Sequence, residues 1–179
     1  MKIQTKQLAL DAMLAAMCAA LGYLALDAGS LKVTLEALPI LLGALLFGPA
    51  DGALIAFVGT AISQLLYYGI SVTTLLWMLP YVLSGFLAGL YAKRRGFSLT
   101  GKQTVLIVAV VEVLIAVLNT GVLYLDSRIY AYWFPGFISA ALLVRAGICI
   151  ATAAAFSAIL PVLLRAVKKI VGTKGGTEE

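Results

Sequence analysis

Residues 103–125 read QTVLIVAVVEVLIAVLNTGVLYL, a run in which Glu112 is the one charged residue. A membrane-spanning helix needs about 20 mainly apolar residues, so this segment is long enough to cross a bilayer. Further apolar segments, bounded by glycine, proline and charged residues, lie at 7–27, 34–48, 52–68, 73–92 and 135–165. We therefore expect an all-α integral membrane protein with about six transmembrane helices.

The composition of the whole chain indicates the same class of protein. Of its 179 residues, 63% are hydrophobic and 12% are charged, whereas soluble domains have about 45–50% apolar and about 25% charged residues. The mean hydropathy is +1.06. A separate catalytic or nucleotide-binding domain needs on the order of 100 residues. We therefore expect a single transmembrane domain over residues 1–179, with a short tail at 1–6 and a disordered tail at 172–179.

The second and third apolar segments are short. The sequence Phe47-Gly48-Pro49-Ala50-Asp51-Gly52 joins them and predicts a tight turn between two helices. Segments of this length can tilt, thin the bilayer or be partly buried in protein. Four or five true crossings are therefore an alternative to six.

The basic residues predict the orientation of the chain. Cytoplasmic loops of membrane proteins are enriched in Lys and Arg. With a cytoplasmic N-terminus, most cations fall on the inner side, namely Lys2, Lys6, Lys93, Arg94, Arg95, Lys102, Arg165, Lys168, Lys169 and Lys174. The outer side then carries Lys32 and Arg128. Both termini are expected to be cytoplasmic, and the net charge of +5 then needs no nucleic-acid partner.

Motifs for catalysis or metal binding are missing from the sequence. There is no histidine, and Cys18 and Cys149 both lie inside apolar segments, which argues against zinc or haem. No Ser-His-Asp set, HExxH motif or Walker motif is present. We therefore expect no enzyme activity, no metal and no cofactor, and any ATP must be hydrolysed by a partner chain.

Two ionisable residues lie at membrane depth, Glu112 and Arg145. A charged residue costs about 2.5–3.5 kcal/mol at the centre of a membrane helix. Counting about 1.5 Å per residue places the two near the same depth, where they could form an ion pair. Alternatively, Arg145 points into an outward-facing cavity, where its planar guanidinium binds a carboxylate.

Aromatic residues gather on the predicted outer side. Trp77 and Tyr81 lie one helical turn apart and could stack on a planar ligand, although belts of Tyr and Trp also mark membrane interfaces. Asn119 either contacts a ligand or cross-links helices. The candidate substrate-binding residues are Glu36, Gln64, Trp77, Tyr81, Asn119, Arg128 and Arg145.

Small residues form two strips on the first helix. Ala12, Ala16 and Ala20 share one face, and Ala15 and Ala19 share another. Such strips let helices approach closely, either within the chain or against a partner protein. The candidate partner-docking residues are Ala12, Ala15, Ala16 and Ala19.

Residues 35–49, LEALPILLGALLFGP, resemble the second helix of the substrate-binding S components of energy-coupling factor (ECF) transporters, including its FGP turn. The segments 118–120 (LNT), 143–145 (LVR) and 160–165 (LPVLLR) resemble the folate-type branch. The resemblance implies a vitamin-capturing subunit in a bacterial cytoplasmic membrane. It also implies two kinds of partner protein, an EcfT-like membrane coupling protein and two cytoplasmic ATPases.

The resemblance assigns roles to several of these residues. It implies that the alanine strips contact the coupling protein, and that loops near Gly29-Ser30-Leu31 and Gly69-Ile70-Ser71 act as gates. For folate or a related carboxylate vitamin, it implies that the aromatic pair stacks on the pterin and that Arg145 and Arg128 bind the glutamate.

Other ligands and other classes of protein remain alternatives. Pantothenate needs only one cation. Riboflavin, a pyrimidine or a queuosine precursor would suit the aromatic residues and leave Arg145 to pair with Glu112. Outside this family, the chain could be a membrane adaptor protein, or an ion-coupled carrier in which Glu112 is a proton site.

Overall fold

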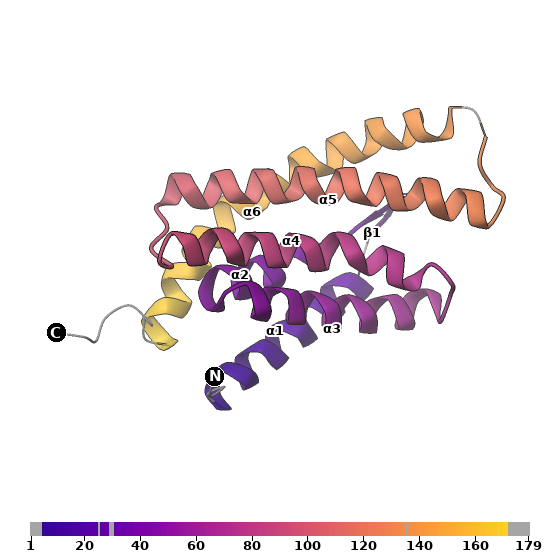
Figure 1. Ribbon diagram of the computed structural model, residues 1–179. Coiled ribbons are helices and arrows are strands. Elements are labelled where there is room, and N and C mark those ends of the chain that lie inside the picture. The colour runs from indigo at the N-terminus through magenta and orange to yellow at the C-terminus, as the bar shows by residue number, and fades with distance from the viewer. Residues whose placement is uncertain (1–4, 25, 29–30, 135, 172–179) are drawn as a thin grey trace.

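The computed structural model describes residues 5–24, 26–28, 31–134 and 136–171. In this part of the chain, the helices are α1 (Thr5–Tyr23), α2 (Ala37–Phe47), α3 (Pro49–Tyr68), α4 (Thr74–Arg94), α5 (Gly101–Ile129) and α6 (Phe137–Val171). Strands β1 (Leu26–Ala28) and β2 (Leu31–Val33) pair antiparallel between α1 and α2. The helices pack side by side in a bundle (Figure 1). The expected all-α fold is confirmed, with a small β-hairpin that the sequence analysis did not predict.

Parts of the expected tails and loops lie outside the described residues. These are residues 1–4 and 172–179, with Lys2 and Lys174, and Gly29 and Ser30 of one expected gate. The expected N-terminal tail is too long by two residues, because α1 already begins at Thr5.

Four of the helices are long and apolar enough to cross a membrane. These are α3, α4, α5 and residues Leu142–Lys169 of α6. Helix α2 has 11 residues, so it extends about 16 Å, roughly half of the ~30 Å hydrocarbon core of a bilayer. Ile40, Leu41 and Leu45 of α2 are almost fully buried. The second apolar segment is therefore enclosed by protein, as the alternative for short segments predicted.

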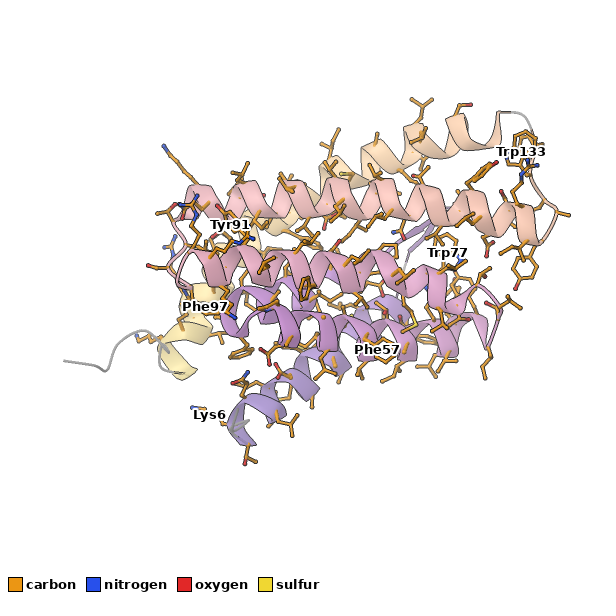
Figure 2. All side chains as sticks on the ribbon, viewed as in Figure 1. Lys6, Phe57, Trp77, Tyr91, Phe97 and Trp133 are labelled. Carbon is orange, nitrogen blue, oxygen red and sulfur yellow. The ribbon has the colours of Figure 1, made fainter. Side chains whose placement is uncertain are left out.

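Several basic residues and the two tryptophans lie toward opposite ends of the bundle, because Lys93 and Arg94 end α4 and Lys168 and Lys169 lie in the last turn of α6. Helix α1 begins at the same end of the bundle at which α6 finishes (Figure 1). Lys6, Tyr91 and Phe97 lie toward this end, and Trp77 and Trp133 lie at the opposite end (Figure 2). We call these the basic end and the aromatic end. Both ends of the described chain therefore lie at the basic end (Figure 1).

The predicted turn between the second and third segments is present. Gly48, with φ of +119°, is the single residue between α2 and α3. A positive φ favours glycine, and Pro49 occupies the start of α3, where its missing N–H costs no helical hydrogen bond. Helix α3 therefore begins three residues before the predicted start at 52.

The backbones of α3 and α4 approach closely at Gly52 and Gly85. A Cβ added at Gly85 would lie 2.5 Å from the carbonyl oxygen of Gly52, and one added at Gly52 would lie 2.7 Å from that of Gly85. Only glycine fits at such a distance, as in other closely packed membrane helices. Helix α4 is held against α3 at this point, and its Trp77 and Tyr81 lie toward the aromatic end.

Candidate functional site

A cavity of about 410 Å³ gathers most of the predicted binding residues. Small-molecule sites have volumes of about 300–1,000 Å³, so the cavity is large enough for a vitamin-sized ligand. Six of the seven candidate residues line it, namely Glu36, Gln64, Trp77, Tyr81, Asn119 and Arg145. They come from α3, α4, α5, α6 and the residue that precedes α2. Trp77 marks the position of the cavity toward the aromatic end (Figure 2).

Arg128 is the predicted residue that does not line the cavity. Its side chain is exposed, and its guanidinium carbon lies 5.7 Å from the ring centroid of Tyr124 and 4.9 Å from that of Trp133. Asp126, which does line the cavity, precedes Arg128 by two residues, or about 200° around the helix. Arg128 therefore points away from the cavity, so the structure does not support its predicted role as a second cation for the ligand.

Three polar residues of α5 form a stripe that runs the length of the site. Glu112, Asn119 and Asp126 are spaced by seven residues, so they share one face of the helix and succeed one another at about 10 Å. Their side chains are buried, with 6%, 8% and 9% exposed. The stripe places three acceptor groups in one line from the middle of the bundle to its aromatic end.

Asp126 connects three segments at the outer end of this stripe. It accepts a hydrogen bond of 3.2 Å from Nε1 of Trp77 and one of 2.5 Å from the hydroxyl of Tyr132. Burial and the hydrogen bond to Asp126 raise the pKa of Tyr132 above its ordinary value. Asp126 is not among the residues predicted from the sequence, although its spacing of seven from Asn119 is visible there.

Glu36 is anchored where β2 leads into α2. Its carboxylate accepts hydrogen bonds from Thr34, at 3.0 Å, and from Ser63 of α3, at 3.3 Å. The hydroxyl of Thr34 also lies 3.4 Å from that of Tyr81. This network connects α3 and α4 with the loop that enters α2, so the wall of the cavity around Tyr81 is held from three sides.

Among the described residues, Glu112 and Arg145 do not form the ion pair that is one of the two alternatives predicted from the sequence. Thr152 of α6 donates a hydrogen bond of 2.6 Å to Oε2 of Glu112, which sets the level at which the antiparallel helices α5 and α6 pass each other. Arg145 precedes Thr152 by seven residues, so its backbone lies about 10 Å further out, level with Asn119. The estimate that both charges share one depth was wrong, and no salt bridge joins them in the described part of the chain.

Arg145 faces the cavity instead. Its side chain is partly buried, and its Nε has no hydrogen-bond partner among the described residues. It lines the large cavity and also a smaller chamber of about 70 Å³, which Glu112 and Thr152 line too. Arg145 therefore stands where the two spaces meet.

The two alanine strips of α1 have different surroundings. Ala12 and Ala16 are exposed, whereas Ala15 and Ala19 have only 5% and 6% of their surface exposed. A Cβ added at Gly59 of α3 would lie 3.0 Å from the carbonyl oxygen of Ala15. Ala15 and Ala19 therefore pack inside the chain, and their predicted role in partner docking is corrected.

The loop between α3 and α4, one of the two expected gates, borders the cavity. Gly69 has φ of +72°, and the backbone N–H of Ser71 donates a 2.9 Å hydrogen bond to Oγ1 of Thr74. Ser71 and Thr73 line the cavity. This loop is therefore one part of the cavity rim.

Comparisons with known proteins give a consistent classification. A family model described as "ECF-type riboflavin transporter, S component" matches residues 2–169. The chain is similar to the solved S component for biotin from an ECF-type ABC transporter, at 19% identity over 92% of this chain and 95% of that one, with a TM-score of 0.69. It is also similar to FolT bound with folic acid, at 25% identity over 84% and 91% of the two chains, with a TM-score of 0.58. A search of the curated proteins gave no match.

The family match and the four long apolar helices show a multi-pass membrane protein. The family consists of substrate-binding transport subunits and not of enzymes. The match confirms the resemblance to ECF S components that the sequence indicated. The chain belongs to the ECF-type riboflavin transporter S component family.

Proposed function

We propose that this chain captures a carboxylate-bearing vitamin of the folate class for an ECF-type importer in a bacterial cytoplasmic membrane. The observation that carries the proposal is Arg145, a cation between helices whose buried Nε has no partner among the described residues and which lines a 410 Å³ cavity. An unpaired buried donor is costly. A ligand carboxylate would satisfy it through charge-assisted hydrogen bonds.

The aromatic wall supports a ligand that also has a flat ring. Trp77 and Tyr81 line the same cavity as Arg145. The hydrogen bond from Trp77 to Asp126 holds the indole in place, and preorganised aromatic rings bind planar ligands at low entropic cost. A vitamin with a planar ring at one end and a carboxylate at the other fits both features. One of the similar solved structures is FolT bound with folic acid.

Riboflavin is the second candidate, because the matching family model carries its name. Its ring system is flat, but it has no carboxylate for Arg145. The two candidates therefore differ in what they require of this residue. Substitution of Arg145 should weaken the binding of folate strongly and that of riboflavin little.

The partner proteins follow from the family and from the outer surface of α1. We propose that an EcfT-like coupling protein docks on the exposed alanines Ala12 and Ala16, and that two cytoplasmic ATPases supply the energy. The described chain forms one helical bundle, which supports a division of labour in which other chains hydrolyse the ATP.

Uptake into proteoliposomes tests the transport role. The chain alone should bind the vitamin without accumulating it, and uptake should require the coupling protein, the ATPases and ATP. Accumulation by the chain alone under a proton gradient would instead show an ion-coupled carrier. A chain that neither binds a vitamin nor supports uptake would be an adaptor protein.

A further inference from the structure

The smaller chamber lies beside the proposed vitamin site, further from the aromatic end. It has a volume of about 70 Å³ and shares Thr34, Tyr81, Asn119 and Arg145 with the large cavity. Its own lining includes Glu112 from α5 and Thr152 from α6. Any group that enters the chamber from the large cavity must pass between these shared residues.

Glu112 and Asn119 present unpaired acceptors in this region. Their side chains are 6% and 8% exposed. Oε1 of Glu112 and Oδ1 of Asn119 are buried and have no hydrogen-bond partner within the described part of the chain. Buried acceptors of this kind are costly unless a donor reaches them, so a bound state should supply one.

The neighbouring protein groups do not supply that donor. The Thr152 hydroxyl is directed at the other carboxylate oxygen, Oε2. Arg145 forms no salt bridge with Glu112 among the described residues, because its backbone is about two helical turns further out. A site for one water needs about 10–15 Å³ of such space. The chamber is therefore large enough for the edge of a ring or for a few waters.

We propose that the chamber recognises the hydrogen-bond-donating edge of the ligand, and that Glu112 is a specificity-determining residue that accepts from it. The inference rests on the proposed function and deepens it. The ligand class is a heterocycle with neighbouring ring N–H and exocyclic amino donors, as in a 2-amino-4-oxopyrimidine ring. Such an edge offers two parallel donors to one carboxylate, the arrangement that makes carboxylate pairing strong.

The chamber also fixes the orientation of the ligand. The amino-bearing ring passes Tyr81 and reaches Glu112. The carboxylate remains further out with Arg145, whose backbone lies about 10 Å closer to the aromatic end than that of Thr152. Glu112 lines only the chamber, whereas Arg145 stands where the chamber meets the large cavity. This arrangement favours a ligand whose donor edge enters first and whose carboxylate stays outside, and it disfavours the reversed orientation by like-charge repulsion.

Pterin and lumazine provide a sharp test, because at position 2 pterin has an amino group where lumazine has an oxo group. The full-length chain in detergent is titrated with folic acid alone and then in competition with each fragment. For the unmodified chain, we expect pterin to compete at least about tenfold better than lumazine. Glu112→Gln should weaken folic acid binding by at least about tenfold. It should also reduce the preference for pterin over lumazine to about twofold or less.

Two further variants keep the result interpretable. Asp51→Asn makes the same change of carboxylate to amide at a residue that bonds Gln7 and lies outside both spaces, so binding and preference should stay as in the unmodified chain. Thr152→Val removes the hydroxyl that positions Glu112 and should reduce the preference while leaving the carboxylate in place. This variant remains informative if Glu112→Gln does not fold.

The outcomes separate this inference from the proposed function. If the unmodified chain binds none of the vitamins, the proposed function is overturned and the inference with it. If it binds folic acid but shows no preference for pterin, or if Glu112→Gln and Thr152→Val both keep that preference, the inference alone is overturned.

Discussion

Thr152 and Glu112 join α6 to α5 through a hydrogen bond of 2.6 Å between the hydroxyl and the carboxylate. Because these helices are antiparallel, the bond places Arg145 about two turns outward of Glu112. Both charges at membrane depth line the small chamber, but their backbones lie at different levels of the bundle. Glu112 lies in the small chamber, and Arg145 borders the cavity in which we place the vitamin.

Arg145→Ala should weaken the binding of folate by at least about tenfold, because the carboxylate loses a charge-assisted bond. Arg128→Ala is the matched control. Arg128 is exposed and stacks on Tyr124 and Trp133, so its removal should change affinity by less than about twofold. Isothermal titration of both purified variants measures the difference. Equal affinity of Arg145→Ala and the unmodified chain would exclude Arg145 as the carboxylate site.

Tyr132→Phe should make the stability of the protein less sensitive to high pH. In the folded chain, burial and the bond to Asp126 raise the pKa of Tyr132 above its ordinary value of about 10. Above that pH the unfolded chain binds fewer protons than the folded one, so the free energy of unfolding falls as pH rises. The contribution of Tyr132 is thus fully present below about pH 10 and is lost as pH rises through the folded pKa.

Unfolding of the unmodified chain and Tyr132→Phe at pH 9 and pH 11 measures this effect. At pH 9, the unmodified chain should be more stable than Tyr132→Phe by about 1 kcal/mol, the usual contribution of one hydrogen bond. This difference in the free energy of unfolding should be smaller at pH 11. A gap that stays constant between the two pH values would show that the Tyr132 hydroxyl does not titrate with folding.

Ala16→Trp should abolish vitamin uptake while sparing vitamin binding. Ala16 is exposed on α1, and a large side chain there would hold the coupling protein away from the helix. Val117→Trp, at an exposed position of α5, is the control and should sustain uptake. Loss of binding in Ala16→Trp would instead place this alanine in the packing of the chain.

Gly85→Ala should destabilise the bundle by about 1–3 kcal/mol, the usual cost of overpacking. Its Cβ would lie 2.5 Å from the backbone oxygen of Gly52 and force α3 and α4 apart. Gly121→Ala on α5 is the matched control, because no atom lies within 4 Å of the added Cβ. This second change should leave stability unchanged or raise it slightly, since alanine is a better helix former than glycine. Equal thermal midpoints for the two variants would contradict the close contact.

The sequence predicted the helices well, because run length and breakers encode them locally. The turn at Gly48 and the start of α3 at Pro49 follow from residues that favour those backbone conformations. The β-hairpin was missed because its strands have three residues each. Such short strands leave too few residues for an alternating pattern to emerge.

The candidate site was harder to predict, because it depends on rotation and register between helices. Arg128 and Asp126 are two residues apart but face opposite ways. Glu112 was expected at the level of Arg145, and the contact with Thr152 shows otherwise. A span counted from its ends carries an error of several residues, and a single bond between helices removes that error.

Thermal unfolding of the purified chain against a panel of vitamins tests the central claim most directly. A ligand that binds only the folded state stabilises it in proportion to the logarithm of its concentration over Kd. The panel contains folate, pantothenate, riboflavin, thiamine, biotin, niacin and a queuosine precursor. We predict a large, saturable shift with folate that Arg145→Ala removes and Arg128→Ala retains. A chain whose unfolding temperature does not change with any of these ligands would contradict its function as a vitamin-binding subunit.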